Sequence, residues 1–379
     1  MEKIRILEMI DKTFLGGGQI HLLSLVKNLD RARFDISVCS RDRGALVDEV
    51  KKNQIKFFPV TFSKRRWGKT VREIAFILKS QRVDILHTHG GVAGLYGRWA
   101  AYKCRTPIIV HTLHGIHYLH YRNALLKFFC ILLERYFSHF TDALIFVSDG
   151  DRKKGQKYKL ASLEKMFVIK NGIDFSEYNK LKVNKEVNIT KELGLESSKP
   201  IVGTVARLHR QKGLIYLLKA AKKISQVFPE VKILIIGEGS LREKLERKAR
   251  SLGLERLVWF FGERRNIPML LSLFDVFILP SLWEGLPYTL IEAGALAKPV
   301  VSTNVDGIRE VIKNEETGIL VPPKNAEILA QAVISLLQDR EYALRLGRKL
   351  KKEIYPRYTL SRMVKETQDL YFKLYQIYN

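Results

Sequence analysis

A chain of 379 residues is too long for one ordinary hydrophobic core, and its 46% hydrophobic content favours two folded domains. The net charge of +26 favours an anionic partner, such as nucleic acid, anionic lipid or a diphosphate substrate. Cys39, Cys104 and Cys130 lie far apart without metal-ligand spacing and are predicted to be thiols in a reducing compartment. Because long apolar runs are absent from the sequence, we expect neither a signal peptide nor a membrane-spanning helix.

The first half of the chain alternates strand-like and helix-length segments. Residues 4–10 form the first strand candidate, and a glycine-rich turn at 16–19 precedes a helix-period run at 21–29. Further strand candidates are 34–39, 84–89, 107–112, 143–148 and 167–169. Strands that alternate with helix-length spacers predict a parallel sheet covered by helices on both faces.

The positive charge is concentrated between residues 51 and 105, where thirteen Lys or Arg accompany two acids, Glu73 and Asp84. An aromatic-rich stretch at 117–140 follows, with Lys and Arg between apolar side chains. This pattern is typical of a helix lying on a bilayer, and equally of a core helix in an α/β layer. Since no nucleic-acid-binding motif is recognisable, we expect peripheral membrane association and no nucleic acid.

The second half repeats the alternation from residue 200 onward. Its strand candidates are 200–208, 231–237, 258–261, 276–279 and 299–302. A polar segment at 174–199 is predicted to be a linker with a short helix at 189–193, and residues 358–375 predict a terminal helix. The expected fold is therefore α/β, with Rossmann-like domains at 1–180 and 181–357. Polar residues follow the strands of both halves, which predicts a ligand cleft between the two domains.

Two groups in the first half resemble metal sites. Five histidines fall within 31 residues, namely His87, His89, His111, His114 and His117. They sit at the ends of two strand candidates without an acid among them, so we predict no metal there. Asp149-Gly150-Asp151 forms a D-x-D, but a helix N-cap at Ser148 or Asp149 explains it better.

The segment 280–297, PSLWEGLPYTLIEAGALA, carries Glu284 and Glu292 eight positions apart, with a helix predicted to start between them. A helix N-terminus suits a phosphate, and a carboxylate such as Glu292 can accept from the two hydroxyls of a ribose. Upstream, Arg207 and Lys212 could clamp a diphosphate across a strand-to-helix turn. The alternative is a set of ordinary loop and helix residues.

Taken together, these elements resemble the E-x7-E and R-x4-K signatures of glycosyltransferase family 4, retaining enzymes of the GT-B fold. The resemblance covers nearly the whole chain and is tightest at 200–213 and 280–322. It implies two facing Rossmann-like domains, with a terminal helix at 358–379 that packs back on the first. It also implies a glycosyltransferase that uses a UDP-, GDP- or similar nucleotide sugar and needs neither metal nor cofactor.

The resemblance also implies roles for individual residues. Glu284 would orient the donor sugar, Arg207 and Lys212 would stabilise the leaving diphosphate, and His114 would hydrogen-bond the sugar near the reacting centre. Donor binding would be completed by Gly17, Gly18, Gly237, Glu238, Leu286, Tyr288, Thr289, Leu290 and Glu292. Gln19 stands where the family often has an acid, and we assign it no role.

Residues 87–94, HTHGGVAG, are similar to a subgroup that acts on polyprenyl-diphosphate-linked acceptors. This similarity implies a lipid-linked glycan or lipid acceptor, used in cell-surface polysaccharide assembly at the cytoplasmic face of the membrane. The alternatives are an epimerase, which would lack E-x7-E, a phosphorylase, which would be much longer, and a basic lipid- or polyanion-binding protein with a vestigial site.

Overall fold

The computed structural model describes residues 2–180, 200–264 and 266–378, which form two compact units. Unit 1 comprises Met1–Gly172 and Leu360–Asn379, and unit 2 comprises Ile173–Thr359. The boundaries predicted from the sequence were 180/181 and 357/358. Residues 173–180 fall in unit 2 because Ile173 bridges to Thr359 and Phe175 packs edge-on against Tyr355. The helix predicted at 189–193 lies outside the described residues.

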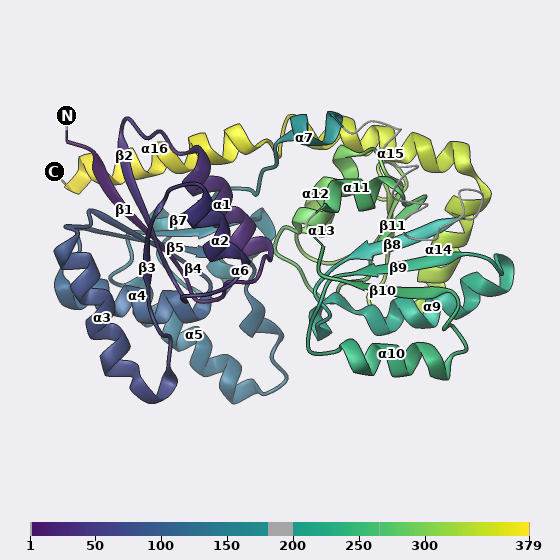
Figure 1. Ribbon diagram of the computed structural model, residues 1–379, viewed down its shortest axis with the longest axis horizontal. Coiled ribbons are helices and arrows are strands. Elements are labelled where there is room, and N and C mark those ends of the chain that lie inside the picture. The colour runs from purple at the N-terminus through teal and green to yellow at the C-terminus, as the bar shows by residue number, and fades with distance from the viewer. Residues whose placement is uncertain (1, 181–199, 265, 379) are drawn as a thin grey trace. The chain divides into compact units, whose positions relative to one another are not determined.

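Unit 1 is built on a seven-stranded parallel sheet in the order β3-β2-β1-β4-β5-β6-β7 (Figure 1). The strands are β1 (Ile4–Ile10), β2 (Phe34–Ser40), β3 (Lys56–Pro59), β4 (Ile85–His89), β5 (Ile108–Leu113), β6 (Ala143–Phe146) and β7 (Met166–Val168). The main helices are α1 (Gly17–Asn28), α2 (Ala45–Lys52), α3 (Trp67–Ser80), α4 (Gly91–Cys104), α5 (Ala124–Ser138), α6 (Asp149–Lys157) and α16 (Leu360–Tyr378). Helices α1 and α16 cover one face of the sheet, and α3 and α4 cover the other.

The two-residue period of a strand decides which side chains meet which helix layer. In β1, Ile6 and Ile10 pack into the core beneath α1 and α16, whereas Leu7 and Met9 pack toward α3 and α4. Glu8 therefore lies on the α16 side, where the other residues of β1, such as Ile6 and Ile10, are apolar. The same alternation turns His87 and His89 of β4 toward α16.

Unit 2 has a six-stranded parallel sheet in the order β10-β9-β8-β11-β12-β13. Its strands are β8 (Ile201–Val205), β9 (Lys232–Ile236), β10 (Val258–Gly262), β11 (Val276–Leu279), β12 (Val300–Thr303) and β13 (Ile319–Val321). The helices are α7 (Phe175–Asn179), α9 (Leu214–Val227), α10 (Arg242–Ser251), α11 (Ile267–Ser272), α12 (Tyr288–Ala295), α13 (Ile308–Val311), α14 (Ala326–Gln338) and α15 (Arg340–Ile354).

The predicted α/β class is confirmed, and each strand candidate is a strand. The short edge strands β3 and β13 were not predicted, and neither was α7, which lies in the segment interpreted as a linker. Helix α1 begins at Gly17 rather than at residue 21, because the Gln19 side chain accepts a hydrogen bond from the Gly16 N–H at 3.2 Å and caps the first turn. In the described part of the chain, each helix is too short or too polar to cross a bilayer.

Candidate active site

In unit 2, the loops after β8 and β11 meet where the order of the sheet reverses. β8 and β11 are paired neighbours, and Leu282 N donates to the Gln211 carbonyl at 2.7 Å across the two loops. Gly213 has φ +62° and lies so close to the Pro280 carbonyl that a Cβ would overlap it. These contacts bring the R-x4-K and E-x7-E elements together at the carboxyl ends of the strands, where open α/β sheets bind ligands.

The Glu284 carboxylate is buried at this junction and accepts hydrogen bonds from three side chains. Lys212 Nζ lies 2.5 Å and Ser281 Oγ 2.6 Å from Oε1, and Gln211 Nε2 lies 3.2 Å from Oε2. Gln211 also donates to the Trp283 carbonyl at 3.0 Å. The carboxylate is therefore held in one orientation, and its charge is matched by an ammonium group.

Arg207 belongs to the same cluster. Its Nη2 lies 3.5 Å from Gln211 Oε1, so both predicted cations are linked to Glu284 directly or through one amide. Gln211 and Ser281 were missed as site residues. Both stand inside the quoted motifs, between Arg207 and Lys212 and three positions before Glu284, which was the available signal.

Glu292 lies one turn into α12 and is also buried. Tyr178 of α7 donates a hydrogen bond from its hydroxyl to Glu292 Oε1 at 3.0 Å. Burial raises the pKa of Glu292 to about 7, even though the bond from Tyr178 acts in the opposite direction. Burial also raises the pKa of the neighbouring Tyr178 and Tyr288 hydroxyls. Tyr178 was missed because it falls in the segment interpreted as a linker.

The predicted phosphate-binding turn, residues 286–290, spans the start of α12, where Pro287 is the N-cap. The Leu290 N–H donates to the Pro287 carbonyl at 3.2 Å, so a phosphate at this turn would be reached by residues before Leu290. Leu286 and Tyr288 are buried side chains that anchor the turn, whereas Thr289 is partly exposed.

The loop after β9 lies against the loop after β8. A Cβ at Gly237, whose φ is +129°, would overlap the Ala206 carbonyl, and the Glu238 carbonyl accepts from Leu208 N at 2.8 Å. The Glu238 carboxylate pairs with Arg242 one turn further along. Backbone contacts with Ala206 and Leu208 thus place Gly237 and Glu238 beside Arg207.

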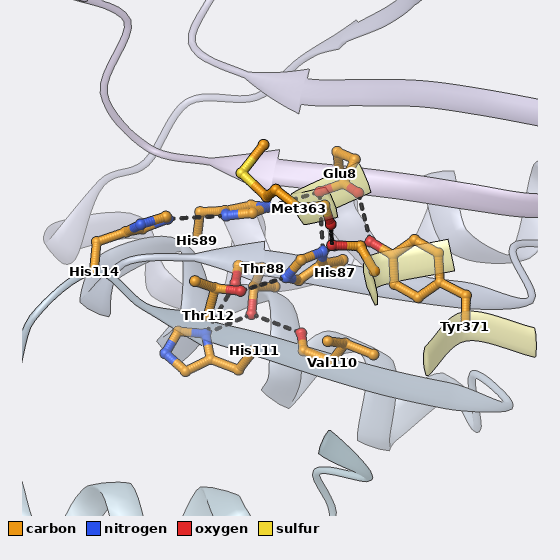
Figure 2. Close-up of polar contacts among 11 residues, drawn as sticks. Glu8, His87, Thr88, His89, Val110, His111, Thr112, His114, Met363 and Tyr371 are labelled. Carbon is orange, nitrogen blue, oxygen red and sulfur yellow. Dashed lines mark hydrogen bonds and ion pairs between the residues drawn. The ribbon is translucent and has the colours of Figure 1, made fainter. Parts of the chain in front are cut away.

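Unit 1 carries a second polar cluster at the ends of β1, β4 and β5 (Figure 2). Glu8 Oε2 accepts from His89 Nε2 at 2.6 Å, and Glu8 Oε1 accepts from the Tyr371 hydroxyl at 2.7 Å. His87 completes the cluster through Tyr371 at 2.5 Å and Thr112 at 2.7 Å. Burial alone would raise the pKa of Glu8, but the interactions with His87 and His89 outweigh it and hold that pKa well below its usual range.

His114 stands at the outer end of this cluster. Its Nε2 lies 3.0 Å from His89 Nδ1, and its ring packs against the rings of His89 and His21. A Cβ added to Gly18 would lie 3.2 Å from His114 Cδ2, so the first turn of α1 touches the imidazole. The predicted Gly17-Gly18 pair and His114 are therefore brought together in unit 1.

The remaining histidines of the group lie elsewhere. His111 points to the α4 side of the sheet, where its Nδ1 bonds Thr88 Oγ1 at 2.8 Å, and His117 belongs to a 3-10 turn after β5. Asp149-Gly150-Asp151 starts α6 with Ser148 as its N-cap, which confirms the helix-cap interpretation.

Glu8, His87 and His89 offer ligand atoms within 4.8 Å of one another, and among the described residues they form a group that could hold a metal ion. Each already has a hydrogen-bond partner, so a metal would have to displace contacts to Tyr371 or His114. Glu8 was missed from the sequence. The available signal was an acid inside the apolar strand 4–10.

Comparisons with known proteins agree with this arrangement. The model described as Glycosyltransferase Family 4 matches residues 15–177, and that described as Glycosyl transferases group 1 matches residues 186–353. The UDP-Gal:alpha-D-GlcNAc-diphosphoundecaprenol alpha-1,3-galactosyltransferase of Escherichia coli is 28% identical, over 98% of this chain and 97% of its own. The putative glycosyltransferase EpsD of Bacillus subtilis is 26% identical, over 79% of each chain.

Among solved structures, HepE of Anabaena in complex with UDP and glucose has a TM-score of 0.87 at 21% identity, covering 98% of this chain and 100% of its own. The fold and the site define the class as glycosyltransferases of GT-B architecture. Within that class, the chain belongs to the group 1 and family 4 glycosyltransferases whose models match its two halves. The epimerase, phosphorylase and binding-protein alternatives are therefore set aside.

Proposed function

We propose that this enzyme transfers a sugar from a nucleotide diphosphate sugar to a lipid-linked acceptor, with retention of the anomeric configuration and without a metal or cofactor. The observation that carries the proposal is the Glu284 cluster, in which Lys212, Gln211 and Ser281 converge on one buried carboxylate beside Arg207. Arg207 and Lys212 supply the positive charge that a leaving diphosphate needs as its bond to the sugar breaks. Glu284 orients the sugar through its hydroxyls.

The environment of Glu284 also supports a particular route for retention. A carboxylate that accepts hydrogen bonds from an ammonium, a hydroxyl and an amide is a weak nucleophile. We therefore propose that the acceptor hydroxyl attacks from the face that the diphosphate leaves. The leaving phosphate takes the proton of that hydroxyl, and no glycosyl-enzyme forms on Glu284.

The substrates are proposed from the relatives. The E. coli relative is named for transfer of galactose from UDP-Gal to GlcNAc-diphosphoundecaprenol, and the HepE structures contain UDP or UDP-glucose. A UDP-hexose donor and a polyprenyl-diphosphate-linked sugar acceptor are the corresponding substrates here. Buried Glu292 is placed to accept hydrogen bonds from the ribose hydroxyls, as acidic residues do in dinucleotide-binding folds.

The test combines binding and transfer. Thermal shift with UDP, GDP, ADP and their sugar conjugates, all in EDTA, should give a clear rise in Tm with one base, since a ligand at a hundredfold excess over its Kd adds about 2.7 kcal/mol of stability. Transfer from UDP-galactose or UDP-glucose to GlcNAc-diphosphoundecaprenol is then followed by NMR of the product anomer. An absence of transfer, an inverted anomer, or activity lost in EDTA and restored by a divalent cation would contradict the corresponding part of the proposal.

Helix α5 supports a membrane-associated acceptor. It turns Glu134 inward, to a bidentate ion pair with buried Arg98 at 2.7 and 3.2 Å, and turns large apolar side chains outward. Leu125 is 70% and Phe129 63% exposed. The outward apolar side chains of this helix are Leu125, Leu126, Phe128, Phe129, Leu132, Leu133 and Tyr136.

This distribution is the reverse of that expected for a helix facing water, and an apolar helix face with basic neighbours suits an anionic bilayer. Arg122 and Lys103, both exposed, supply positive charge on the adjoining turn and on α4. We propose that α5 lies on the cytoplasmic face of the cell membrane, where the lipid-linked acceptor is presented.

Vesicle co-sedimentation tests the membrane proposal. Leu125→Asp with Phe129→Asp should abolish binding to vesicles containing phosphatidylglycerol, while the control Ile377→Asp, at an equally exposed position on α16, should not. Normal vesicle binding by the double variant would show that α5 is not a membrane surface. The same conclusion would follow if the unsubstituted protein were a dimer that does not bind vesicles and the double variant were a monomer.

A further inference from the structure

The carboxylate of Glu8 determines which atom donates and which accepts in the hydrogen bonds of the unit 1 cluster. Glu8 receives hydrogen bonds from Tyr371 and His89, and these contacts favour its ionised form. The contact of 3.0 Å between His89 Nδ1 and His114 Nε2 needs one donor and one acceptor, which two imidazolium rings cannot supply, so the geometry supports neutral imidazoles. In this state each ring has one nitrogen that donates and one that accepts.

The positions of the protons follow step by step from Glu8. An ionised carboxylate only accepts, so His89 Nε2, at 2.6 Å, carries the ring proton. His89 Nδ1 is then an acceptor, and its partner at 3.0 Å, His114 Nε2, must be the donor. His114 is therefore the Nε2–H tautomer, and its Nδ1 is the hydrogen-bond acceptor of the ring.

A second branch of hydrogen bonds in the cluster, through His87 and Tyr371, also leads to Glu8. The Tyr371 hydroxyl donates to Glu8, so it accepts from His87 Nδ1, and His87 Nε2 lies 2.7 Å from the Thr112 hydroxyl. This branch ends on Thr112 and does not include His114. It anchors Glu8 from the other side, so the carboxylate cannot turn away from His89.

We propose that Glu8 and His89 are positioning residues, which hold His114 as its Nε2–H tautomer so that Nδ1 accepts a hydrogen bond from a hydroxyl of the substrate. The proposal rests on the proposed function and on the role that the family resemblance implies for His114, a contact with the donor sugar. An acceptor nitrogen suits a sugar hydroxyl and repels a phosphate oxygen. The cluster in unit 1 thus favours a hydroxyl-bearing group over a phosphate as its ligand.

The tautomer can be observed directly in the unsubstituted enzyme. Ring ¹⁵N chemical shifts of protein labelled at histidine, with the His114 signals identified by their loss in His114→Gln, distinguish a protonated from an unprotonated nitrogen. The expected result is a protonated Nε2 and an unprotonated Nδ1 at pH 7.5. A protonated Nδ1 overturns the proposal without any measurement of activity, so this outcome is separate from failure of the proposed function.

Glu8→Gln tests the contribution of the carboxylate to catalysis. It keeps the size of the side chain but removes the charge that sets the direction of the bonds, so we expect kcat to fall by about tenfold to a hundredfold, with the Kd of the nucleotide diphosphate unchanged. The His114 ring shifts should move toward a mixture of tautomers. Wild-type kcat with unchanged shifts would overturn the proposal.

The matched control is Thr112→Val, which removes a buried hydroxyl from the branch that does not reach His114. It should lower Tm but leave kcat and the His114 shifts unchanged. If Thr112→Val lowers kcat as much as Glu8→Gln, the cluster acts only through stability, and the proposal fails. It also fails if purified enzyme carries one equivalent of zinc that His87→Gln abolishes, because a metal on Glu8 and His89 would replace these hydrogen bonds.

Discussion

Each unit holds a carboxylate where the order of its sheet reverses, but the two carboxylates are stabilised differently. Glu8 of unit 1 lies on a central strand, is fully buried and is bonded by an imidazole and a phenol, whereas Glu284 of unit 2 lies on a loop and pairs with an ammonium. An ion pair to a lysine can exchange when a diphosphate arrives, because the cation gains an equivalent partner. The network around Glu8 is built from imidazole and phenol groups inside the core and keeps one arrangement. The Glu284 cluster is therefore suited to rearrangement on binding, and the Glu8 cluster to fixed geometry.

The largest expected effect comes from removing the exchangeable cation. Lys212→Ala should lower kcat by about 100- to 1000-fold, because the leaving diphosphate loses one of its two charge partners. Glu284→Ala should be at least as severe, because the sugar loses its orienting group. Steady-state transfer assays measure both variants, and circular dichroism checks that the fold is kept.

Lys223→Ala is the matched control, since it removes an ammonium that pairs with Glu327 at half-exposed positions on α9 and α14. Turnover of this variant should be unchanged. Wild-type turnover in both Lys212→Ala and Glu284→Ala would show that the site has been assigned to the wrong residues.

The next largest effect tests whether the Glu8 cluster is more rigid than the Glu284 cluster. Tyr371→Phe removes a buried donor to the Glu8 carboxylate and should lower the free energy of unfolding of unit 1 by about 1–3 kcal/mol. Ser281→Ala should cost less, because Glu284 keeps Lys212 and Gln211. Urea unfolding measures both, and Tyr378→Phe, at an exposed position on α16, serves as the control. Equal losses for Tyr371→Phe and Ser281→Ala would remove the distinction drawn between the two clusters.

The smallest effect is a pH dependence carried by Glu292. Its pKa of about 7 means that a proton must leave before the carboxylate can accept from two ribose hydroxyls, so affinity for the nucleotide sugar should rise about tenfold from pH 6 to pH 8. Because this pKa is raised on folding, the folded state holds the proton more tightly than the unfolded state. The associated stability is therefore complete below the unfolded pKa and is lost as the pH rises through about 7.

Isothermal titration with the nucleotide sugar identified by thermal shift measures this dependence. A sugar ester of a diphosphate does not itself titrate in this range, so the change reports the protein. Glu292→Gln should bind with an affinity that is flat in pH. An equally steep profile in that variant would assign the dependence to another group.

The site of unit 2 was predictable from the sequence because its chemistry is local. Arg207, Gln211 and Lys212 stand within six positions, and Ser281 and Glu284 within four, each group directly after a strand. The R-x4-K and E-x7-E spacings of the family then indicate that the loops after β8 and β11 belong to one site. The details that were not predicted, such as the bond from Tyr178 to Glu292, join segments 114 positions apart.

The site of unit 1 was predictable only in part. Strand periodicity placed His87 and His89 at the end of a strand, and the loop motif indicated His114. The central carboxylate was not predicted, because Glu8 and Tyr371 are separated by 363 positions and no spacing rule joins them. The edge strands β3 and β13 were not predicted for another reason. Each is only three or four residues long and partly exposed, so its apolar pattern is weak.

The bond between Tyr371 and Glu8 has a consequence for biosynthesis. Glu8 leaves the ribosome before unit 2 is translated, whereas α16 is translated only after all of unit 2. Until then the nascent N-terminal sheet exposes the apolar strip that Met363, Val364 and Leu370 later cover, and its central carboxylate lacks one donor. Unit 1 is thus begun before unit 2 and completed only after it, so the folding of unit 1 must wait for the synthesis of the unit that interrupts it in the sequence.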